Sequence, residues 1–338
     1  MALARHGNAL FATLTGILDR RTLEPTICAL PPDVGFEGET VLITGANSGL
    51  GFAIAKDIAR RGAARLILAC RSGIPEAGAS IARETGHPRI EMRRVDLTDL
   101  TSVHALADGL RDEGVVLDRV ILNAGVMPAR DSATKQGFEL MFGVNFLANA
   151  CLVLRLLEDG VIPNSSLASA PREAPRPPRV VLVASDAHRS GHPIDMARFG
   201  EYRTYGVRDG LKQYGHSKLA LIVFAQALAK RLAPQGEPEV EVFSLCPGPV
   251  NTNISREAPA FVKPLLSWVM GRFFASPEEA AEPVVYLARA DELNGRSGIY
   301  VHMRVEKPPA AQALDSACQE QLWEATLALL ERVGRDRS

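Results

Sequence analysis

The chain has 338 residues, of which 46% are hydrophobic, and its 38 basic residues nearly balance its 39 acidic ones. This length and composition predict a globular protein with a full hydrophobic core, and they favour one large domain over two. The balanced charge argues against nucleic acid as a partner, because binding to phosphates requires a basic face. Five scattered cysteines without C-x-x-C spacing and seven histidines without an H-E-x-x-H pattern indicate a reducing compartment and no metal site.

Residues 1–38 precede the first predicted strand and form an N-terminal extension, an amphipathic helix followed by a proline-rich turn at Pro31 and Pro32. Basic residues border the apolar stripe of this helix, which consists of Leu10, Phe11, Leu14, Ile17 and Leu18. The stripe is too short and too interrupted for a membrane span, and it lacks the cleavage site of a signal peptide. We expect the helix either to dock on the protein's own core or to lie on a membrane surface. We therefore expect a cytoplasmic protein, peripheral to a membrane in the second case.

From residue 39 onward, short apolar strands alternate with longer segments of helical period. Strands are predicted at Thr40–Thr44, Arg65–Cys70, Ile90–Val95, Arg119–Leu122, Val180–Ala184, Val240–Leu245 and Ile299–His302. Helices are predicted at Leu50–Arg61, Pro75–Thr85, Leu100–Glu113, Phe138–Asp159, Tyr214–Leu232, Pro277–Ala290 and Ala317–Val333. Strands that are apolar on both faces are typical of a parallel sheet covered by helices on both sides. The pattern predicts a single α/β domain over residues 39–305, with a doubly wound parallel sheet.

Three further segments depart from the regular alternation. Residues 163–178 are rich in proline, serine and alanine, which predicts an exposed, flexible insertion. Residues 249–275 are long, apolar and interrupted by prolines, and a connection of this kind after a late strand is typical of a functional loop. We interpret it as a loop that covers the substrate, and a subunit or membrane contact is the alternative. Residues 306–338 are expected to form a C-terminal helical tail.

A glycine turn follows the first predicted strand. Thr44 runs directly into Gly45-Ala46-Asn47-Ser48-Gly49-Leu50-Gly51, and a predicted helix begins within that turn. The backbone N–H groups and the dipole of a helix N-terminus favour phosphate. The spacing G-x-x-x-G-x-G differs from the G-x-G-x-x-G spacing of many dinucleotide sites. Such a turn can be purely structural, but after the first strand of an α/β sheet it favours a nucleotide.

The end of the second predicted strand indicates which nucleotide is bound. An NAD site usually carries an acidic residue there, which holds the ribose 2′-hydroxyl. This chain has Cys70 and then Arg71. A guanidinium can bind a 2′-phosphate through two charge-assisted hydrogen bonds. We therefore predict NADP(H) in preference to NAD(H), and a solvated arginine is the alternative.

Tyr214 and Lys218 stand four residues apart in a segment of helical period, so they share one helical face. A tyrosine normally titrates near pH ~10, which makes it a poor acid or base at neutral pH. A neighbouring ammonium favours the phenolate and is expected to lower the pKa of Tyr214, which would tune it for acid/base chemistry. Taken alone the pair is a weak signal, because two solvated side chains often share this spacing. His216 between them is interpreted as a residue of the helix face.

Together these residues resemble the short-chain dehydrogenase/reductase superfamily in its form with a single Rossmann domain, from about Thr40 to about His302. The motifs occur in the family's order: Thr44-Gly45-x-x-x-Gly49-x-Gly51, Asp96-Leu97, Asn123-Ala124-Gly125, Asn145, Ser185, Tyr214-x-x-x-Lys218, and Pro247-Gly248 with Thr252. The sequence that flanks these motifs is similar to that of the retinol dehydrogenase-like branch. The family often has asparagine, serine and histidine where this chain has Leu122, Ala184 and Cys246, and none of these departures removes a catalytic group.

The resemblance implies a role for each matching residue. A catalytic tetrad is implied at Asn145, Ser185, Tyr214 and Lys218. Asp96 would hold the adenine amino group, and Lys218 would hold the nicotinamide ribose. The implied cofactor-binding residues are Gly45, Asn47, Ser48, Gly49, Leu50, Gly51, Arg71, Asp96, Leu97, Asn123, Ala124, Gly125, Tyr214, Lys218, Pro247, Gly248 and Thr252. Asn145 would steady a water in the proton relay, and a structural hydrogen bond is its alternative role.

The resemblance also implies an activity, the interconversion of a lipophilic alcohol and its ketone or aldehyde, with a retinoid- or steroid-like substrate and NADP(H). Because cells keep NADP(H) largely reduced, carbonyl reduction is the expected direction. Two alternatives remain: a catalytically silent NADP(H)-binding regulator of the same fold, and a sugar-nucleotide epimerase or dehydratase. Relatives often pair through helices that here are residues 138–159 and 214–232, so a homodimer or homotetramer is expected.

Overall fold

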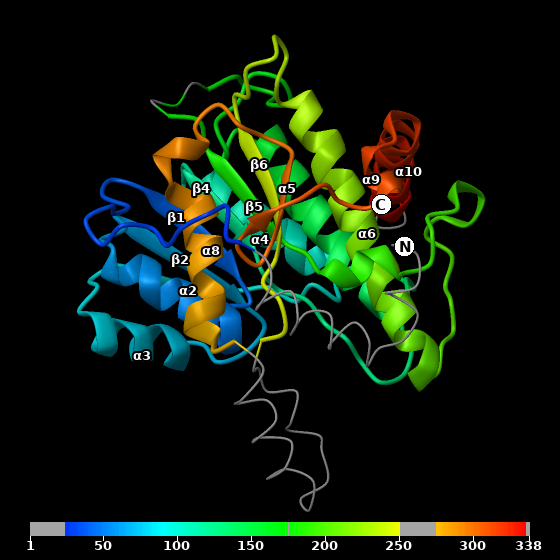
Figure 1. Ribbon diagram of the computed structural model, residues 1–338, viewed down its shortest axis with the longest axis horizontal. Helices are drawn as coiled ribbons and strands as arrows, with labels where there is room; N and C mark the ends of the chain where they lie inside the picture. Colours follow the sequence, from blue (N-terminus) through cyan, green and yellow to red (C-terminus); the bar gives the residue numbers. More distant parts are fainter. Residues whose placement is uncertain (1–23, 173, 175, 251–274, 336–338) are drawn as a thin grey trace, which may run out of the picture.

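The computed structural model describes residues 24–250, except 173 and 175, and residues 275–335 (Figure 1). The predicted N-terminal helix, Thr252 and nearly all of the predicted substrate loop lie outside the described residues. No helix of the described part is long and apolar enough to cross a membrane.

One eight-stranded sheet forms the centre of the fold, in the order β3-β2-β1-β4-β5-β6-β7-β8. Its strands are β1 Thr40–Thr44, β2 Arg65–Cys70, β3 Ile90–Arg94, β4 Arg119–Leu122, β5 Arg179–Val183, β6 Glu241–Cys246, β7 Ile299–His302 and β8 Val305–Glu306. All neighbouring strands pair in parallel except β7 and β8. The strand order reverses at β1, so the chain leaves β1 and β4 in opposite directions and opens a crevice at their carboxyl ends. The predicted doubly wound sheet is confirmed.

Helices cover both faces of this sheet. One face carries α2 Gly49–Arg60, α3 Glu76–Thr85 and α8 Pro277–Arg289, and the other carries α4 Leu100–Asp112, α5 Ala148–Glu158 and α6 Val207–Arg231. In Figure 1, α2 and α8 lie side by side on the first face. Side chains of β1 alternate between the two cores, because Leu42 packs on the second face while Val41 and Ile43 pack on the first. Burial on both faces explains why the strands are almost wholly apolar.

The C-terminal tail packs on the second face. It consists of α9 Ala311–Leu314 and α10 Ser316–Arg335, which confirms the predicted helix in this region. Trp323 of α10 stacks on Phe224 of α6 with ring centroids 5.6 Å apart, and Arg231 lies over the Trp323 ring at 4.2 Å. The residues of α5 and α6 are thus largely buried within the chain by α4 and α10. Subunit pairing through these helices stays a prediction.

Two predicted helices begin differently from their sequence pattern. The segment predicted as Phe138–Asp159 contains a π-helix at Phe142–Leu147 before α5 begins. Helix α6 begins at Val207 rather than at Tyr214. Its first turns are polar and contain a glycine, so the apolar helical period cannot be recognised there. These turns are held in place because buried Gln213 donates to Glu139 at 2.7 Å.

The segments outside the regular alternation are held by polar side chains. Arg61 donates to the carbonyls of Leu30, Pro31 and Val34, which ties the chain ahead of β1 to α2. Near the start of the predicted flexible insertion, the Oδ1 of buried Asn164 accepts from the N–H groups of Leu167 and Ala168. Glu239 then binds the backbone of Ser165 and Ser166. The start of this insertion is therefore anchored to the domain.

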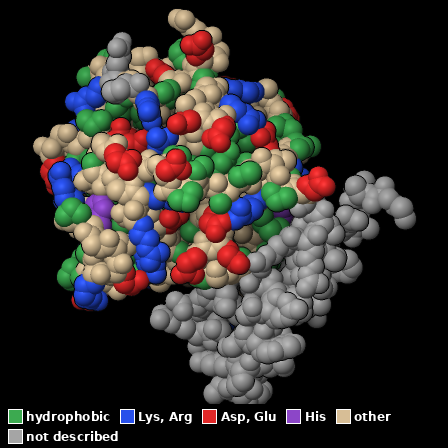
Figure 2. All heavy atoms as spheres, turned by 60° about the vertical axis from the view of Figure 1, so that its left-hand side comes forward, with side chains coloured by type: hydrophobic (Ala, Val, Ile, Leu, Met, Phe, Trp, Pro, Cys, Tyr) green, Lys and Arg blue, Asp and Glu red, His purple; other side chains and the backbone are tan. Residues whose placement is uncertain are grey.

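The surface carries both charge signs. On the face seen in Figure 2, acidic and basic side chains are interspersed with neutral ones. This is the surface expected from a chain whose basic and acidic residues nearly balance.

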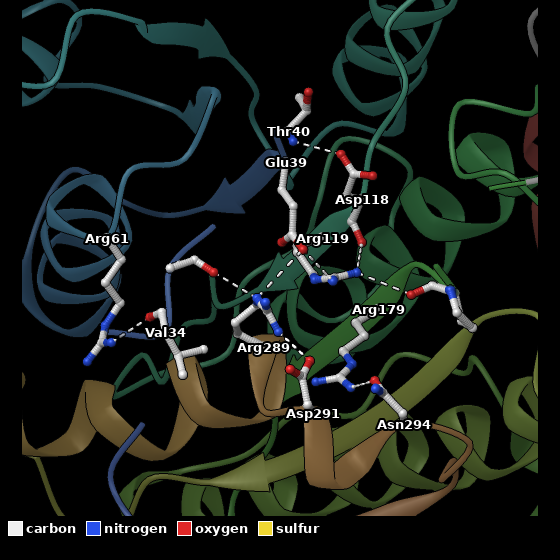
Figure 3. A network of polar contacts seen from close by, with 12 residues as sticks. Val34, Glu39, Thr40, Arg61, Asp118, Arg119, Arg179, Arg289, Asp291 and Asn294 are labelled. Carbon is white, nitrogen blue, oxygen red and sulfur yellow. Dashed lines mark hydrogen bonds and ion pairs between the residues drawn. The ribbon is translucent and has the colours of Figure 1, made fainter. Parts of the chain in front are cut away.

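Buried ion pairs lie at the amino ends of the central strands, and Figure 3 shows Arg119 with Glu39 and Arg179 with Asn294. Arg119 of β4 pairs with Glu39 at 2.7 Å, and Arg179 of β5 pairs with Glu241 of β6 at 2.6 Å. Arg179 also donates to the carbonyl of Leu287 in α8 and to the side chain of Asn294. Charges buried this deeply are tolerated only when they are paired and hydrogen-bonded. The network joins the sheet to α8 at the edge opposite the crevice.

We expect Arg179→Met to lower the free energy of unfolding by ~3–5 kcal/mol, because it leaves the Glu241 carboxylate buried without its partner. The double change Arg179→Met with Glu241→Leu should recover most of that loss. Urea denaturation followed by circular dichroism measures both. The control is Arg198→Met, in a pair with Glu201 that is about half exposed, and its cost should stay below ~1 kcal/mol. Equal losses in all three variants would contradict this account of the network.

Candidate active site

The glycine turn between β1 and α2 requires glycine at two positions. Gly45 has φ +68°, and a Cβ there would lie 3.0 Å from Ala124. A Cβ on Gly51 would lie 2.4 Å from the Gly45 carbonyl oxygen and 2.5 Å from the Asn123 amide nitrogen. Ser48 precedes α2 in an extended conformation and makes no side-chain cap. The first N–H groups of α2 therefore stay available to an anion, as the turn predicts.

Thr44 joins the ends of β1 and β4. Its buried hydroxyl accepts from the backbone N–H groups of Asn123 and Ala124 at 3.0 and 3.1 Å. The Asn123 side chain returns a bond to the Thr44 carbonyl at 3.0 Å. After β3, the Asp96 carboxylate accepts from the backbone and hydroxyl of Thr98. The residues expected to contact the adenosine half of a cofactor thus follow neighbouring strands, at the carboxyl edge of the sheet.

Arg71 lies exposed directly after β2, beside the glycine turn. Parallel pairing of β1 and β2 sets Thr44 opposite Ala69, and Asn47 in the turn donates to Ser72 at 3.5 Å. Burial raises the pKa of the Cys70 thiol, so this group is neutral at pH 7. The end of β2 therefore presents a cation and no carboxylate, which is suitable for a 2′-phosphate.

The four expected catalytic residues come together beyond β4 and β5. Ser185 follows β5 and lies close enough to the Tyr214 phenol to lower the pKa of that phenol. Lys218 donates to the carbonyl of Val183, the last residue of β5, at 2.8 Å, and its Nζ lies 5.7 Å from the centre of the Tyr214 ring. A Cβ on Gly125 would lie 3.2 Å from the Asn145 oxygen and 3.4 Å from the Lys218 nitrogen. Because Gly125 has no side chain, the side chains of Asn145 and Lys218 can both approach its backbone.

Asn145 sits in the π-helix ahead of α5 and is fully buried. Its Oδ1 accepts from the Val126 N–H at 2.7 Å, and its Nδ2 donates to the Val126 carbonyl at 2.9 Å and to the Ser217 hydroxyl at 3.1 Å. The structural hydrogen bonds considered as its alternative role are therefore present. Single π-helical turns occur frequently at functional sites, because they re-aim a side chain within a helix. Here the turn lets one amide join the end of β4 to α6.

Burial is the largest influence on the pKa values of Tyr214 and Lys218. It raises the pKa of Tyr214 to about 12, against the hydrogen bond from Ser185, which lowers it. Burial also lowers the pKa of Lys218 to about 8. The prediction that Lys218 lowers the pKa of Tyr214 is therefore wrong for this structure, because removing the phenolate from water outweighs any neighbouring charge. At neutral pH Tyr214 is protonated and can donate.

A second glycine contact joins the loop after Ser185 to α6. A Cβ on Gly215 would lie 2.4 Å from the Ala187 carbonyl oxygen and 2.7 Å from the Cα of Gly191. The glycine inside the Tyr214–Lys218 motif thus admits the backbone that follows Ser185. His216 is buried and its Nδ1 contacts the His192 carbonyl at 3.0 Å, which confirms its interpretation as a structural residue.

The turn after β6 carries Pro247 and Gly248. Gly248 has φ +80°, and a Cβ there would lie 2.8 Å from the Met303 side chain. A cavity of about 270 Å³ adjoins this turn, between the start of α8 and the loop after β7. Within the described residues, no group of three or more His, Cys, Asp or Glu is placed to hold a metal ion.

Several residues around Ser185 are not part of the motifs recognised in the sequence. Asp186 accepts at one oxygen from the Tyr300 hydroxyl at 3.0 Å and from Arg189 Nε at 3.0 Å, and Lys307 lies 3.2 Å from the same oxygen. The nearby cations hold the pKa of Asp186 well below its usual range although burial opposes them. His188 is also buried beside Ser185. The local signal is the run Ser185-Asp186-Ala187-His188, but Tyr300 and Lys307, which contact Asp186, lie more than a hundred residues away.

Comparison with known proteins agrees with this geometry. A family profile described as "short chain dehydrogenase" matches residues 39–161, and one described as "Enoyl-(Acyl carrier protein) reductase" matches residues 187–303. Retinol dehydrogenase 13 of Mus musculus is 34% identical over 89% of this chain and 86% of its own length. Retinol dehydrogenase 14 of Homo sapiens is 35% identical over 94% of this chain and 95% of its own length. Polyprenol dehydrogenase of Mus musculus is 34% identical over 91% and 87%.

Solved structures share the fold. A putative uncharacterized protein from Mycobacterium Paratuberculosis superposes with a TM-score of 0.67 and 28% identity, over 90% of this chain and 98% of that one. The angucycline C-6 ketoreductase LanV, solved with bound NADP, superposes with a TM-score of 0.59 and 26% identity, over 80% and 95%.

The lowered pKa of Lys218 predicts how stability depends on pH. The unfolded chain holds this proton more tightly than the folded protein, because the ordinary lysine pKa is 10.5 and the folded value is about 8. The free energy of unfolding should therefore rise by about 2 kcal/mol between pH 8 and pH 10. In Lys218→Met this contribution should vanish. The control is Lys212→Met, which removes an exposed lysine of the same helix. Parallel pH curves for wild type and Lys218→Met would contradict a depressed pKa.

Proposed function

Because the chain belongs to the short-chain dehydrogenase/reductase family, we propose that it uses NADP(H) to reduce the carbonyl group of a lipophilic ketone or aldehyde. The observation that carries this proposal is the cluster of partly buried Ser185 and Tyr214 with buried Lys218 at the carboxyl edge of the sheet. Ligands of open α/β sheets bind in the crevice at that edge, near the point where strand order reverses.

The nicotinamide, when bound, supplies the hydride for this chemistry. Negative charge then grows on the carbonyl oxygen, and the Tyr214 phenol donates its proton there. The Ser185 hydroxyl donates a hydrogen bond to the same oxygen. A Tyr214 pKa of about 12 means that the proton consumed in carbonyl reduction is in place at neutral pH. Lys218, whose ammonium lies near the Tyr214 ring and donates to the Val183 carbonyl, would hold the ribose hydroxyls of the cofactor.

Asn145 contributes to the same centre in a more limited way. Its amide is already engaged by Val126 and by Ser217, so it fixes the end of β4 against the catalytic turn of α6. We propose that this framework also holds the water expected in a proton relay to Lys218, since Gly125 leaves space between the two side chains. The relay would return a proton to Tyr214 after each turnover.

Cofactor choice is proposed from the end of β2. Arg71 is exposed beside the turn, and the neutral Cys70 stands where NAD enzymes carry a carboxylate. The LanV ketoreductase, which shares this fold at 26% identity, was solved with NADP. These observations favour NADP(H) over NAD(H).

The lipophilic substrate class is proposed from relatives and from the crevice itself. Relatives named retinol dehydrogenase and polyprenol dehydrogenase act, by their names, on long apolar alcohols. In this chain Met127 follows the Asn123–Gly125 motif with 55% of its surface exposed. An exposed thioether next to a catalytic edge is suitable for contact with an apolar ligand.

We expect Tyr214→Phe to lower kcat/KM by roughly 10²–10⁴-fold, equivalent to about 3 kcal/mol or more of transition-state stabilisation. Consumption of NADPH with retinal, steroid ketones and simple aryl ketones measures this loss. Binding of NADPH, followed by fluorescence, should be unchanged, because the phenol ring and the fold are retained. Tyr202→Phe is the control, because Tyr202 is an exposed phenol bonded to Asp131. Near wild-type turnover in Tyr214→Phe would exclude Tyr214 as the acid.

Arg71→Ala should weaken NADPH binding by about tenfold or more and leave NADH binding within about twofold, because only the 2′-phosphate loses its partner. Titration of each cofactor against both proteins measures the four dissociation constants. Arg83→Ala, at the far end of the helix that follows Arg71, is the control for the loss of a surface arginine. An unchanged preference for NADPH in Arg71→Ala would remove Arg71 as the phosphate ligand.

A further inference from the structure

The chain turns into a short 3-10 helix, η2 Asp186–Arg189, immediately after Ser185. The Ser185 carbonyl oxygen lies 2.8 Å from Nδ1 of His188 and also accepts the backbone N–H of His188 at 3.2 Å. His188 is 1% exposed. The peptide that carries the Ser185 hydroxyl is therefore held by the imidazole three residues later.

Only one tautomer of His188 fits its two partners. Its Nε2 lies 3.0 Å from the backbone nitrogen of Ala310, and a backbone N–H can only donate. Nε2 must therefore accept, which places the ring proton on Nδ1. Nδ1–H then donates to the Ser185 carbonyl. A directional chain of two hydrogen bonds runs from Ala310 through His188 to Ser185.

Residues 307–310, here named the C-terminal strap, are bound to η2 at further points. The Lys307 ammonium lies 3.2 Å from the Asp186 carboxylate, and Arg189 donates to the Pro308 carbonyl at 2.5 Å. The ring of Tyr300 meets the His188 ring edge-on at 5.0 Å, and its hydroxyl donates to Asp186. The strap follows β8 and lies beyond residues 187–303, where the second family profile ends.

On its other side η2 contacts the catalytic helix. The Ala187 carbonyl and the Gly191 backbone approach Gly215 so closely that a Cβ would not fit. The η2 backbone is therefore held between the strap and the turn of α6 that carries Tyr214. A shift on the strap side is transmitted to Ser185, because the α6 side cannot yield.

We propose that His188 is a positioning residue for Ser185, and that the C-terminal strap holds His188 in place through the Ala310 N–H. The inference rests on the proposed role of Ser185 in stabilising the carbonyl oxygen. Loss of either hydrogen bond lets η2 relax and moves the Ser185 hydroxyl away from Tyr214. A displacement of about 1 Å at a reacting centre can cost about 10²-fold in rate. Cofactor binding should not change, because the glycine turn lies on β1 and α2.

Three substitutions at His188 separate the two hydrogen bonds. In His188→Asn the amide nitrogen can take the position of Nδ1 and keep the bond to Ser185. In His188→Gln the amide oxygen can take the position of Nε2 and keep the bond from Ala310. His188→Phe keeps a ring and loses both bonds. We expect His188→Phe to lower kcat about 10- to 100-fold with an NADPH dissociation constant within about twofold. His188→Asn should keep the most activity and His188→Gln should resemble His188→Phe. Equal activity in all three variants overturns the proposal.

The role of the C-terminal strap is tested by substituting proline for Ala310, which removes the N–H that His188 accepts. Ala310 has φ −59°, which suits proline, so Ala310→Pro deletes the N–H with little change of backbone. Ala311→Pro is the matched control, because proline is tolerated at the first position of a helix and Ala311 opens α9 and is exposed. We expect Ala310→Pro to lower kcat at least about fivefold and Ala311→Pro to leave it unchanged. Equal kcat values in the two variants overturn the role of the strap.

A double-mutant cycle separates positioning from general destabilisation. In a Ser185→Ala background, His188→Phe should cause no further loss of the single-turnover rate, because the group that it positions is gone. A multiplicative loss would overturn the proposal. If Ser185→Ala alone turns over like the wild type, the proposed function of Ser185 fails instead. Hydrogen exchange of the 185–190 amides needs no substrate and should accelerate about tenfold in His188→Phe. Unchanged exchange overturns the inference whatever the activity.

Discussion

Parallel pairing of β1, β4 and β5 is the constraint on which the site depends. Parallel strands end at the same edge, so the residues that follow each strand meet without being near in sequence. The Thr44 hydroxyl fixes the end of β4 to the end of β1, and the Lys218 ammonium fixes α6 to the last residue of β5. These contacts set the distance between the glycine turn and the Tyr214 phenol. The buried pair of Arg179 and Glu241 holds β5 and β6 together at the other edge.

The two edges of the sheet use polar groups in different ways. At the amino edge Arg119 and Arg179 are buried with carboxylate partners, which makes the network structural. At the carboxyl edge Lys218 is equally buried, yet its ammonium donates to the neutral carbonyl of Val183. That arrangement lowers the pKa of Lys218 to about 8 and is unfavourable for folding at neutral pH. Costly burial of an ionisable group in a crevice is typical of a functional site.

The sequence predicted the strands well, because a short apolar run is a local signal. Four strands have the predicted bounds: β1, β2, β4 and β7. Each is an apolar run that is bounded by a turn or by charged residues. The π-helix was missed because Asn145 bonds to Val126 and Ser217, which only the folded chain brings near. The role of His188 was missed for the same reason, since Ala310 is 122 residues away. The pKa of Tyr214 was predicted in the wrong direction because neighbour charge can be read from a motif and burial cannot.

In the proposed mechanism Tyr214 is a proton donor that lies between Ser185, which precedes η2, and Lys218, which is bonded to the end of β5. The central claim is that this cluster completes a hydride transfer to a carbonyl carbon. The most direct measurement uses NADPH deuterated at C4 of the nicotinamide, with retinal, a steroid ketone and an aryl ketone as acceptors. Mass spectrometry should find one deuterium on the carbinol carbon of the alcohol product. Tight NADPH binding without deuterium transfer to any of these carbonyls would contradict the account and would favour a cofactor-binding regulator.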